Sequence, residues 1–307
     1  MGKEVLCVCD VSDQEFWRIP ESLLQSIREQ LPENIELNVV HTTADFLSEI
    51  KTAHYIIGFP FSANLIRRNK SLKWVHFLTA HVPSSWDKMR DKIDITDSKG
   101  INSSSVLNHA TYLVFKALRG EVFDVTSTRW QPNDFFVAQD PDVLSLGVMG
   151  YGEIGSKIVG RMKGFFRDTN VLSRSEKELP GNCCFYSLAQ ISEFLQMSDV
   201  IIMVLPLNKE TKQLFDHAFY GNLKEGVTLI NLSRGELIDE GALLSHLAED
   251  KKFRYLTDVV TPEPYPEDGE LLKHPRVYVT PHIAGRQKGV WSVLEKRISP
   301  LINQYVK

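Results

Sequence analysis

The chain has 307 residues, of which 43% are hydrophobic and 24% charged, and its formal net charge is −4. These values are typical of globular proteins, and the length suits two domains. A net-acidic chain is not expected to bind nucleic acid or an anionic membrane surface. The start, MGKEVLCVCDVSDQEF, has the pattern of neither a signal peptide nor a membrane span, and the four cysteines lack metal-binding spacing. We therefore expect a cytoplasmic protein with buried, reduced thiols and no metal site.

The first hundred residues alternate between short apolar runs and helical patterns. The predicted strands are Val5–Val8, about Glu36–Val40 and Tyr55–Gly58, and the predicted helices are about Pro20–Gln30 and Ala44–Ile50. Further short elements continue to Ile95. This alternation predicts a small α/β unit.

The pattern changes at SKGINSSSVLNHATYLVFKALRG. Three serines at 103–105 can cap a helix, and apolar residues then recur on one helical face from Val106 to Leu118.

A second α/β series starts at Val143. Its predicted strands are Leu144–Met149, Asn170–Leu172, Val200–Leu205, Thr228–Leu232, Tyr255–Val259 and Val277–Thr280. Its predicted helices are Ile154–Phe165, Leu188–Gln196, Thr211–Asn222 and Ala242–Ala248. Short apolar strands between helices indicate a parallel sheet covered on both faces. The last stretch, GVWSVLEKRISPLINQYVK, is helical in pattern; we predict a break at Pro300 and a return to the first domain.

A glycine-rich turn follows the first strand of this series. Gly150-Tyr151-Gly152-Glu153-Ile154-Gly155 fits the pattern GxGxxG, with a strand before it and a helix after it. In a dinucleotide-binding turn the first glycine makes the tight turn, the second lets the pyrophosphate approach, and the third lets helix and strand pack closely. The helix N-terminus then faces the phosphates. A glycine-rich turn without a ligand is the alternative, which the strand, spacing and helix together disfavour.

The end of the next strand lacks the acidic residue that usually hydrogen-bonds the ribose 2′-hydroxyl of NAD. It carries Ser173, Arg174 and Ser175 instead. A guanidinium can bind a 2′-phosphate bidentately, and the two hydroxyls can donate to it. We therefore predict a preference for NADP(H), with NAD(H) possible; the alternative is a solvated loop in which Arg174 has no role.

Four charged residues follow later strands: Arg234, Asp258, Glu263 and His282. Because ligands bind beyond the carboxyl ends of parallel strands, we expect these residues at one rim. There Arg234 could hold a substrate carboxylate and polarise a carbonyl, and His282 could transfer a proton. Glu263, if close, would stabilise the protonated imidazole. Singly, each residue also has a structural explanation, as a turn arginine, a loop glutamate or a structural histidine.

The motifs GYGEIG, LPLNKETKQLF, LINLSRGELIDEGAL, DVVTPEP and TPHIAG occur in this order. Together they resemble the D-isomer-specific 2-hydroxyacid dehydrogenases, over nearly the whole chain and most strongly from Leu144 to Gly285. The resemblance implies that Arg234, Glu263 and His282 are catalytic and that Asp258 contacts the nicotinamide carboxamide.

The resemblance also implies a fold class: α/β, with two Rossmann-like domains on doubly wound parallel sheets and an active-site cleft between them. Residues 1–100, completed by a C-terminal helix at 286–307, would form the substrate domain, and residues 101–285 the dinucleotide-binding domain. Homodimers would form through the latter. The predicted cofactor-binding residues are Gly150, Gly152, Glu153, Ile154, Gly155, Ser173, Arg174, Ser175, Leu205, Leu232, Ser233, Asp258 and Gly285. The predicted substrate-binding residues are Ala80, His81 and Arg234.

Strand ends of the SRS type are similar to those of the NADPH-preferring glyoxylate/hydroxypyruvate reductases. The predicted function is therefore hydride transfer from NADPH to a small 2-oxo acid, giving a D-2-hydroxy acid. Three positions depart from the family pattern, which usually has Gly at His81, Asp at Pro83 and Glu at Asn108. These departures leave the substrate open. The alternatives are an NAD-dependent D-2-hydroxyacid dehydrogenase and a non-catalytic, cofactor-sensing protein similar to the corepressors that share this fold.

Overall fold

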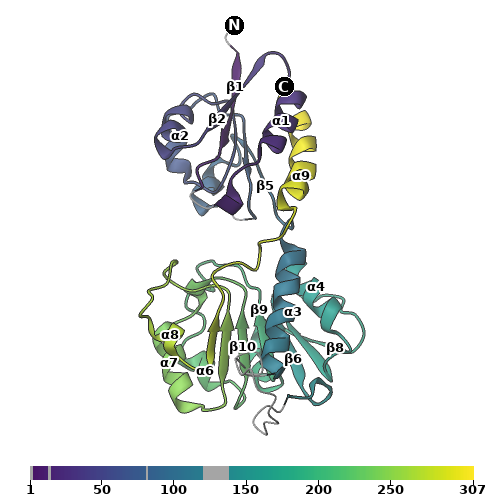
Figure 1. Ribbon diagram of the computed structural model, residues 1–307. Helices are drawn as coiled ribbons and strands as arrows, with labels where there is room; N and C mark the ends of the chain where they lie inside the picture. The colour runs from purple at the N-terminus through teal and green to yellow at the C-terminus, as the bar shows by residue number, and fades with distance from the viewer. Residues whose placement is uncertain (1–2, 13–14, 81, 120–137) are drawn as a thin grey trace, which may run out of the picture. The chain divides into compact units, whose positions relative to one another are not determined.

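The structure is a computed structural model that describes residues 3–12, 15–80, 82–119 and 138–307. It contains two compact units (Figure 1). The first unit comprises Met1–Asn102 and Gln287–Lys307, and the second comprises Ser103–Arg286. The sequence had suggested boundaries at 100/101 and 285/286. Each unit is built on one parallel sheet, which confirms the predicted α/β class with two parallel-sheet domains.

The first unit has a five-stranded parallel sheet in the order β2-β1-β3-β4-β5. Its strands are β1 (Glu4–Cys9), β2 (Ile35–Val40), β3 (Tyr55–Gly58), β4 (Trp74–Phe77) and β5 (Asp94–Asp97). Successive side chains of a strand point to opposite faces. Leu6 and Val8 of β1 accordingly join the core beneath α1 (Glu21–Gln30) and α9 (Val290–Tyr305), whereas Cys7 and Cys9 join the core beneath α2 (Thr43–Glu49).

The last helix, α9, continues through Pro300, so the predicted break was wrong. One face of α9 repeats every four residues and is buried in the core of the first unit: Val290, Leu294, Ile298 and Ile302. Full burial of one aliphatic side chain is worth about 1.5–3 kcal/mol, whereas a proline inside a helix costs about 3 kcal/mol. The buried face therefore outweighs the proline.

The second unit has a seven-stranded parallel sheet in the order β12-β11-β10-β9-β6-β7-β8. Its strands are β6 (Ser145–Met149), β7 (Asp168–Leu172), β8 (Cys183–Tyr186), β9 (Val200–Met203), β10 (Thr228–Asn231), β11 (Arg254–Thr257) and β12 (Val277–Val279). The strand order reverses between β6 and β9. Such a reversal is where open α/β sheets bind their ligands.

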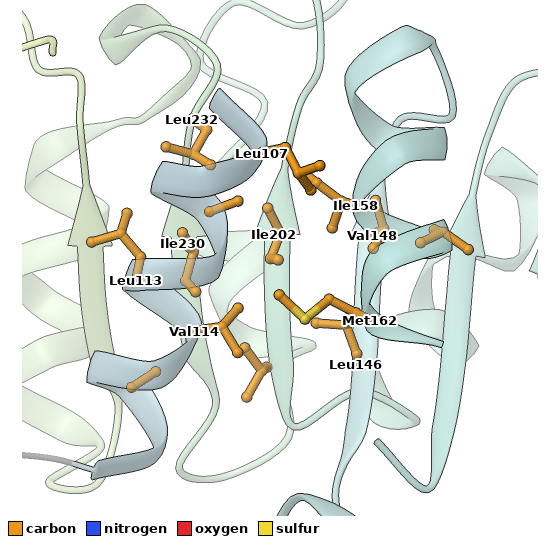
Figure 2. Close-up of a cluster of buried hydrophobic side chains, with 14 of the residues drawn as sticks. Leu107, Leu113, Val114, Leu146, Val148, Ile158, Met162, Ile202, Ile230 and Leu232 are labelled. Atoms are coloured by element: carbon orange, nitrogen blue, oxygen red, sulfur yellow. The ribbon is translucent and has the colours of Figure 1, made fainter. Parts of the chain in front are cut away.

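Helices cover both faces of this sheet. On one face lie α3 (Ser103–Arg119) and α4 (Glu153–Met162), whose apolar side chains pack on the strands (Figure 2). Leu113 and Val114 of α3 and Ile230 of β10 belong to this core. The other face is covered by α5 (Ile191–Gln196), α6 (His217–Gly221) and α7 (Glu240–Glu249).

Several details differ from the prediction. The strand β8 and the short helix α8 (Glu270–Lys273) were not predicted. The helix predicted from Thr211 begins only at His217, because the Asp216 side chain caps it by accepting the Phe219 N–H at 2.9 Å. Cys184 is exposed, so the expectation of buried thiols fails there.

None of the helices in the described residues has the length and apolar character needed to span a bilayer. Within the same residues, no group of three or more His, Cys, Asp or Glu side chains could hold a metal ion.

Candidate active site

The carboxyl ends of five strands of the second unit lie in one row. The last residues of β6, β9, β10, β11 and β12 pair successively with one another: Met149, Met203, Asn231, Thr257 and Val279. The segments that follow these strands therefore leave the sheet at one edge. This register explains why residues more than a hundred positions apart in sequence reach the same rim.

The three glycines of the turn after β6 have distinct roles. Gly150 has φ +102°, and a Cβ atom there would come within 2.7 Å of the Val204 carbonyl oxygen. A Cβ atom at Gly155 would overlap the Gly150 carbonyl oxygen. Both positions require glycine, because no side chain fits between the backbones.

The middle glycine faces open space. Gly152 is the N-cap of α4, and a Cβ atom there would meet nothing within 4 Å. Glu153 and Ile154 form the start of α4, whose first N–H groups have no partner within the helix. An open turn before a helix N-terminus fits the pyrophosphate of a dinucleotide.

The loops after β9 and β10 are tied together beside this turn. The Leu205 N–H donates to the Ser233 hydroxyl at 2.8 Å, and the Ser233 N–H donates to Asn231 Oδ1 at 2.9 Å. The Leu205 side chain borders the turn at Gly150. Leu232 is buried in the core, so its side chain supports the loop from below. Gly285, another predicted cofactor-binding residue at this edge, lies in the turn after β12.

The segment after β7 carries no carboxylate at its first three positions. The Ser173 N–H donates to the Tyr186 carbonyl oxygen at 3.1 Å, which keeps this segment beside β8. Arg174 and Ser175 are exposed. Within the described parts of the chain, the Arg174 side chain makes no hydrogen bond or ion pair, so its guanidinium is available to an anion.

Histidine and glutamate meet at the carboxyl edge. His282, the third residue after β12, has its Nδ1 atom 2.6 Å from Glu263 Oε2. Burial, which opposes ionisation, is the largest influence on the pKa of Glu263. The hydrogen bond and charge of His282 outweigh it, with smaller help from the Val260 N–H and the Arg234 charge, and lower the pKa. Glu263 is thus an ionised partner for the imidazole, within the field of Arg234.

Arg234 is the third residue after β10 and is exposed. Its Nη1 atom donates to the Ser233 carbonyl oxygen at 2.7 Å. The next residue, Gly235, was not predicted as part of the site. A Cβ atom there would overlap the Val260 carbonyl group. The glycine therefore lets the Arg234 loop lie directly against the backbone that leads to Glu263; the Arg-Gly pair was the only local signal for this contact.

The Asp258 carboxylate is buried, with 2% of the residue exposed, and it holds the loop that carries His282. Its Oδ1 atom accepts the Thr280 hydroxyl at 2.6 Å and the Ile283 N–H at 2.9 Å. Its Oδ2 atom accepts the Ala284 N–H at 2.7 Å. Sequence reasoning assigned Asp258 to the cofactor alone and missed this role, since the bonds join segments more than twenty residues apart.

The residues predicted to bind substrate from the N-terminal part lie in the first unit. Ala80 is exposed and is the third residue after β4. His81 lies outside the described residues. Pro83 precedes a 3-10 helix at Ser84–Met89, and Asn108 is exposed on α3 in the second unit.

Comparison with known proteins agrees with these features. The profile described as "D-isomer specific 2-hydroxyacid dehydrogenase, NAD binding domain" matches residues 114–284, more than half of the chain. The chain belongs to this family.

Among curated members, the chain is 34% identical over 155 residues to a glyoxylate/hydroxypyruvate reductase A of Citrobacter koseri. This match spans 50% of the chain and only about half, 49%, of that relative. The chain is also 34% identical over 238 residues to a 4-methyl-2-oxopentanoate reductase A of Aspergillus oryzae. This second match covers 73% of the chain and 69% of the relative.

Solved structures of the family share the fold. A D-mandelate dehydrogenase of Rhodotorula graminis aligns with a TM-score of 0.81 at 19% identity, covering 98% of this chain and 94% of that one. A D-isomer specific 2-hydroxyacid dehydrogenase of Xanthobacter autotrophicus Py2, in complex with NADPH and MES, aligns with 0.78 at 20% identity, covering 99% and 95%. An NAD-dependent formate dehydrogenase of Staphylococcus aureus, in complex with NAD, aligns with 0.79 at 21% identity, covering 98% and 95%.

Proposed function

We propose that this chain reduces a small 2-oxo acid to a D-2-hydroxy acid with NADPH. One observation carries the proposal. The His282–Glu263 pair and Arg234 leave the sheet at the same edge as the open glycine turn. A proton donor, a cation and a phosphate cradle at one edge are what reduction of an anionic carbonyl compound requires.

The residues of the second unit fit NADPH, which supplies a hydride when bound. The glycine turn and the first N–H groups of α4 would hold the pyrophosphate. Arg174 would pair with the 2′-phosphate, while Ser173 and Ser175 donate hydrogen bonds to it.

The remaining charged groups act on the substrate. Arg234 binds the substrate carboxylate and polarises the adjacent carbonyl, which stabilises the charge that grows on its oxygen. The His282 Nδ1 atom is held by Glu263, so the Nε2–H points away from this pair and gives its proton to that oxygen. With the hydride that NADPH would supply, this proton would complete the hydroxy acid. The Glu263 carboxylate accepts the Nδ1–H of the neutral imidazole that remains, and it stabilises the imidazolium once a proton from water restores it.

The first unit would serve as the substrate domain. Its Ala80 and His81 would offer backbone N–H groups to the substrate carboxylate, as the family resemblance implies. By the same resemblance, a second copy of the chain is the expected partner in a homodimer.

Arg174 carries the proposal for cofactor choice, because similar folds are known with either cofactor. The Xanthobacter structure contains NADPH and the Staphylococcus structure contains NAD. The relatives' names also differ in substrate, between glyoxylate or hydroxypyruvate and 4-methyl-2-oxopentanoate. Side-chain size of the 2-oxo acid is therefore the variable to test.

The test measures initial rates of NADPH and NADH oxidation with glyoxylate, hydroxypyruvate, pyruvate and 4-methyl-2-oxopentanoate. We expect turnover with at least one acid and faster turnover with NADPH. Arg174→Asp should erase or reverse that preference. Arg161→Asp, an equal charge change at the far end of α4, is the matched control and should leave it unchanged. Faster turnover with NADH in the unmodified chain would contradict the role of Arg174, and no turnover with any acid would contradict the proposed function.

A further inference from the structure

Helix α3 and strand β12 are joined by polar contacts on one face of the helix. His109, Tyr112 and Lys116 are spaced by three and four residues, so they share a face. The Tyr112 and Tyr278 hydroxyls are 2.6 Å apart, and the Lys116 ammonium lies 4.1 Å from the centre of the Tyr278 ring. His109 Nε2 lies 2.9 Å from the Thr280 hydroxyl. This polar stripe is separate from the apolar face of α3, which covers the sheet.

The hydrogen bonds from His109 run in one direction. The Asp258 carboxylate only accepts, so the Thr280 hydroxyl donates its hydrogen to Oδ1 at 2.6 Å. The Thr280 oxygen then accepts the Nε2–H of His109. Burial lowers the pKa of His109 against the opposing charge of Asp258, which favours a neutral imidazole with its proton on Nε2. The series of hydrogen bonds therefore runs from His109 through Thr280 to Asp258.

This chain of bonds ends at the loop of the proton donor. Asp258 also accepts the N–H groups of Ile283 and Ala284, the two residues after His282. His282 has φ +50°, a left-handed conformation that costs a non-glycine residue about 1–2 kcal/mol. Such a conformation persists only where the surroundings hold it. Here both flanks of His282 are tied to one buried carboxylate.

We propose that His109 and Thr280 are positioning residues: through Asp258 they hold His282 in the backbone conformation that directs its imidazole at Glu263. The proton-transfer purpose of this arrangement rests on the proposed function. The arrangement itself can be tested without any turnover.

The first test observes the imidazole directly in the full chain. Protein labelled with ¹³C at histidine Cε1 is titrated by NMR, and the His282 signal is assigned with His282→Gln. Thr280→Val, which removes the hydroxyl at nearly constant volume, should shift that signal and its titration midpoint, and Thr280→Ser should restore both. Thr228→Val, a buried threonine at the amino end of β10, is the matched control and should leave both unchanged. A His282 titration in Thr280→Val identical to that of the unmodified chain would overturn the proposal.

The second test separates positioning from cofactor binding. We expect Thr280→Val and His109→Leu each to lower kcat by about 10- to 100-fold, because small displacements of a reacting group have effects of this size. The NADPH dissociation constant, measured by fluorescence, should change by less than about twofold, the margin within which we count binding as unaltered. His109→Gln keeps a donor and should retain most of the activity, and the double variant His109→Leu/Thr280→Val should be no worse than either single change.

The outcomes of the two tests are distinguishable. If the unmodified chain reduces no 2-oxo acid, the proposed function fails while the NMR comparison still decides the positioning role. If His109→Leu leaves both kcat and the His282 titration unaltered, His109 has no positioning role. If Thr280→Val fails to fold, the His109→Leu and His109→Gln pair carries both measurements.

Discussion

Each of the two sheets has a histidine–carboxylate pair just beyond its carboxyl edge. In the first unit His41 Nδ1 lies 3.1 Å from Asp10 Oδ2, and in the second His282 Nδ1 lies 2.6 Å from Glu263 Oε2. We assign the first pair a structural role, because the other Asp10 oxygen accepts the Ile19 N–H at 2.8 Å and so ties the residue after β1 to the segment before α1. The second pair belongs to the group we propose as catalytic. The pair alone therefore does not define the chemistry.

The neighbours of each pair make the difference. In the second unit Arg234 adds a positive charge, and the glycine turn adds an open helix N-terminus. In the first unit β1 is followed by Asp10-Val11-Ser12, and the sequence has no glycine between Gly2 and Gly58. In the proposed mechanism, two units of one fold class thus differ in role through a few residues at the strand ends.

The largest expected effect comes from His282, with His41 as its counterpart in the first unit. His282→Gln should lower kcat by about 10²- to 10⁴-fold, the usual contribution of a general acid. His41→Gln, the same change in the matching pair of the first unit, should leave kcat within about twofold, since that pair transfers no proton in the proposed mechanism. Steady-state rates of both variants measure the contrast. Equal losses would show that the two pairs are functionally alike and would break the comparison.

A buried histidine of the first unit should make its stability depend on pH. His76 of β4 is fully buried, and burial, aided by the charge of Arg297, lowers its pKa from 6.5 to about 4. The Trp74 indole N–H donates to the Thr96 hydroxyl, His76 Nδ1 lies 2.9 Å from the same hydroxyl, and His76 Nε2 lies 2.9 Å from the Ser98 hydroxyl. Both ring nitrogens thus have hydrogen-bond partners inside the core, where burial disfavours the charged imidazolium.

The direction in which pH changes the stability follows from proton binding. Between pH 6.5 and about 4 the unfolded chain binds the His76 proton and the folded chain does not, so stability falls as the pH falls, by about 3 kcal/mol in total. Urea unfolding followed by tryptophan fluorescence measures this, because four of the five tryptophans belong to the first unit: Trp17, Trp74, Trp86 and Trp291. His76→Gln should flatten the pH dependence. If the unfolding free energy of His76→Gln depends on pH as steeply as that of the unmodified chain, other groups cause the dependence.

A smaller effect is expected from a change at Arg234 that keeps its positive charge. Arg234→Lys keeps the charge but loses the bidentate geometry, so we expect a loss of one charge-assisted hydrogen bond, about 1.5–3 kcal/mol in the transition state. That corresponds to roughly a 10- to 150-fold lower kcat/KM. The NADPH dissociation constant serves as the control. A lysine variant with unaltered kcat/KM would show that Arg234 acts only as a point charge.

The smallest effect concerns the backbone under Arg234. Gly235→Ala forces a methyl group against the Val260 carbonyl, so we expect about 1–3 kcal/mol of destabilisation and a further loss of activity. Gly160→Ala is the matched control, because a Cβ atom there meets nothing within 4 Å and alanine favours the helix by about 0.5–1 kcal/mol. Thermal unfolding of the two variants should shift in opposite directions. A shift of both unfolding temperatures in the same direction would contradict the close packing of Gly235 on the Val260 backbone.

The sequence by itself determined the local features. The strand, glycine turn and helix from Leu144 to Phe165 were predictable because each depends on neighbours in sequence. The ends of β10 and β12 were placed closely enough to single out Arg234 and His282. Predictions failed where distant contacts decided the outcome: the core of the first unit keeps α9 helical through Pro300, and β8 forms as a short strand along β7.

Only the tertiary structure decided which of these residues meet. The row from Met149 to Val279 depends on the register of five strands, which no local pattern encodes. The bond from His109 to Thr280 joins residues 171 positions apart. Periodicity and turn chemistry act over a few residues, whereas packing and hydrogen bonds between strands act wherever the folded chain brings groups within a few ångströms. The sequence therefore supplied the chemical groups, and the fold arranged them at one edge.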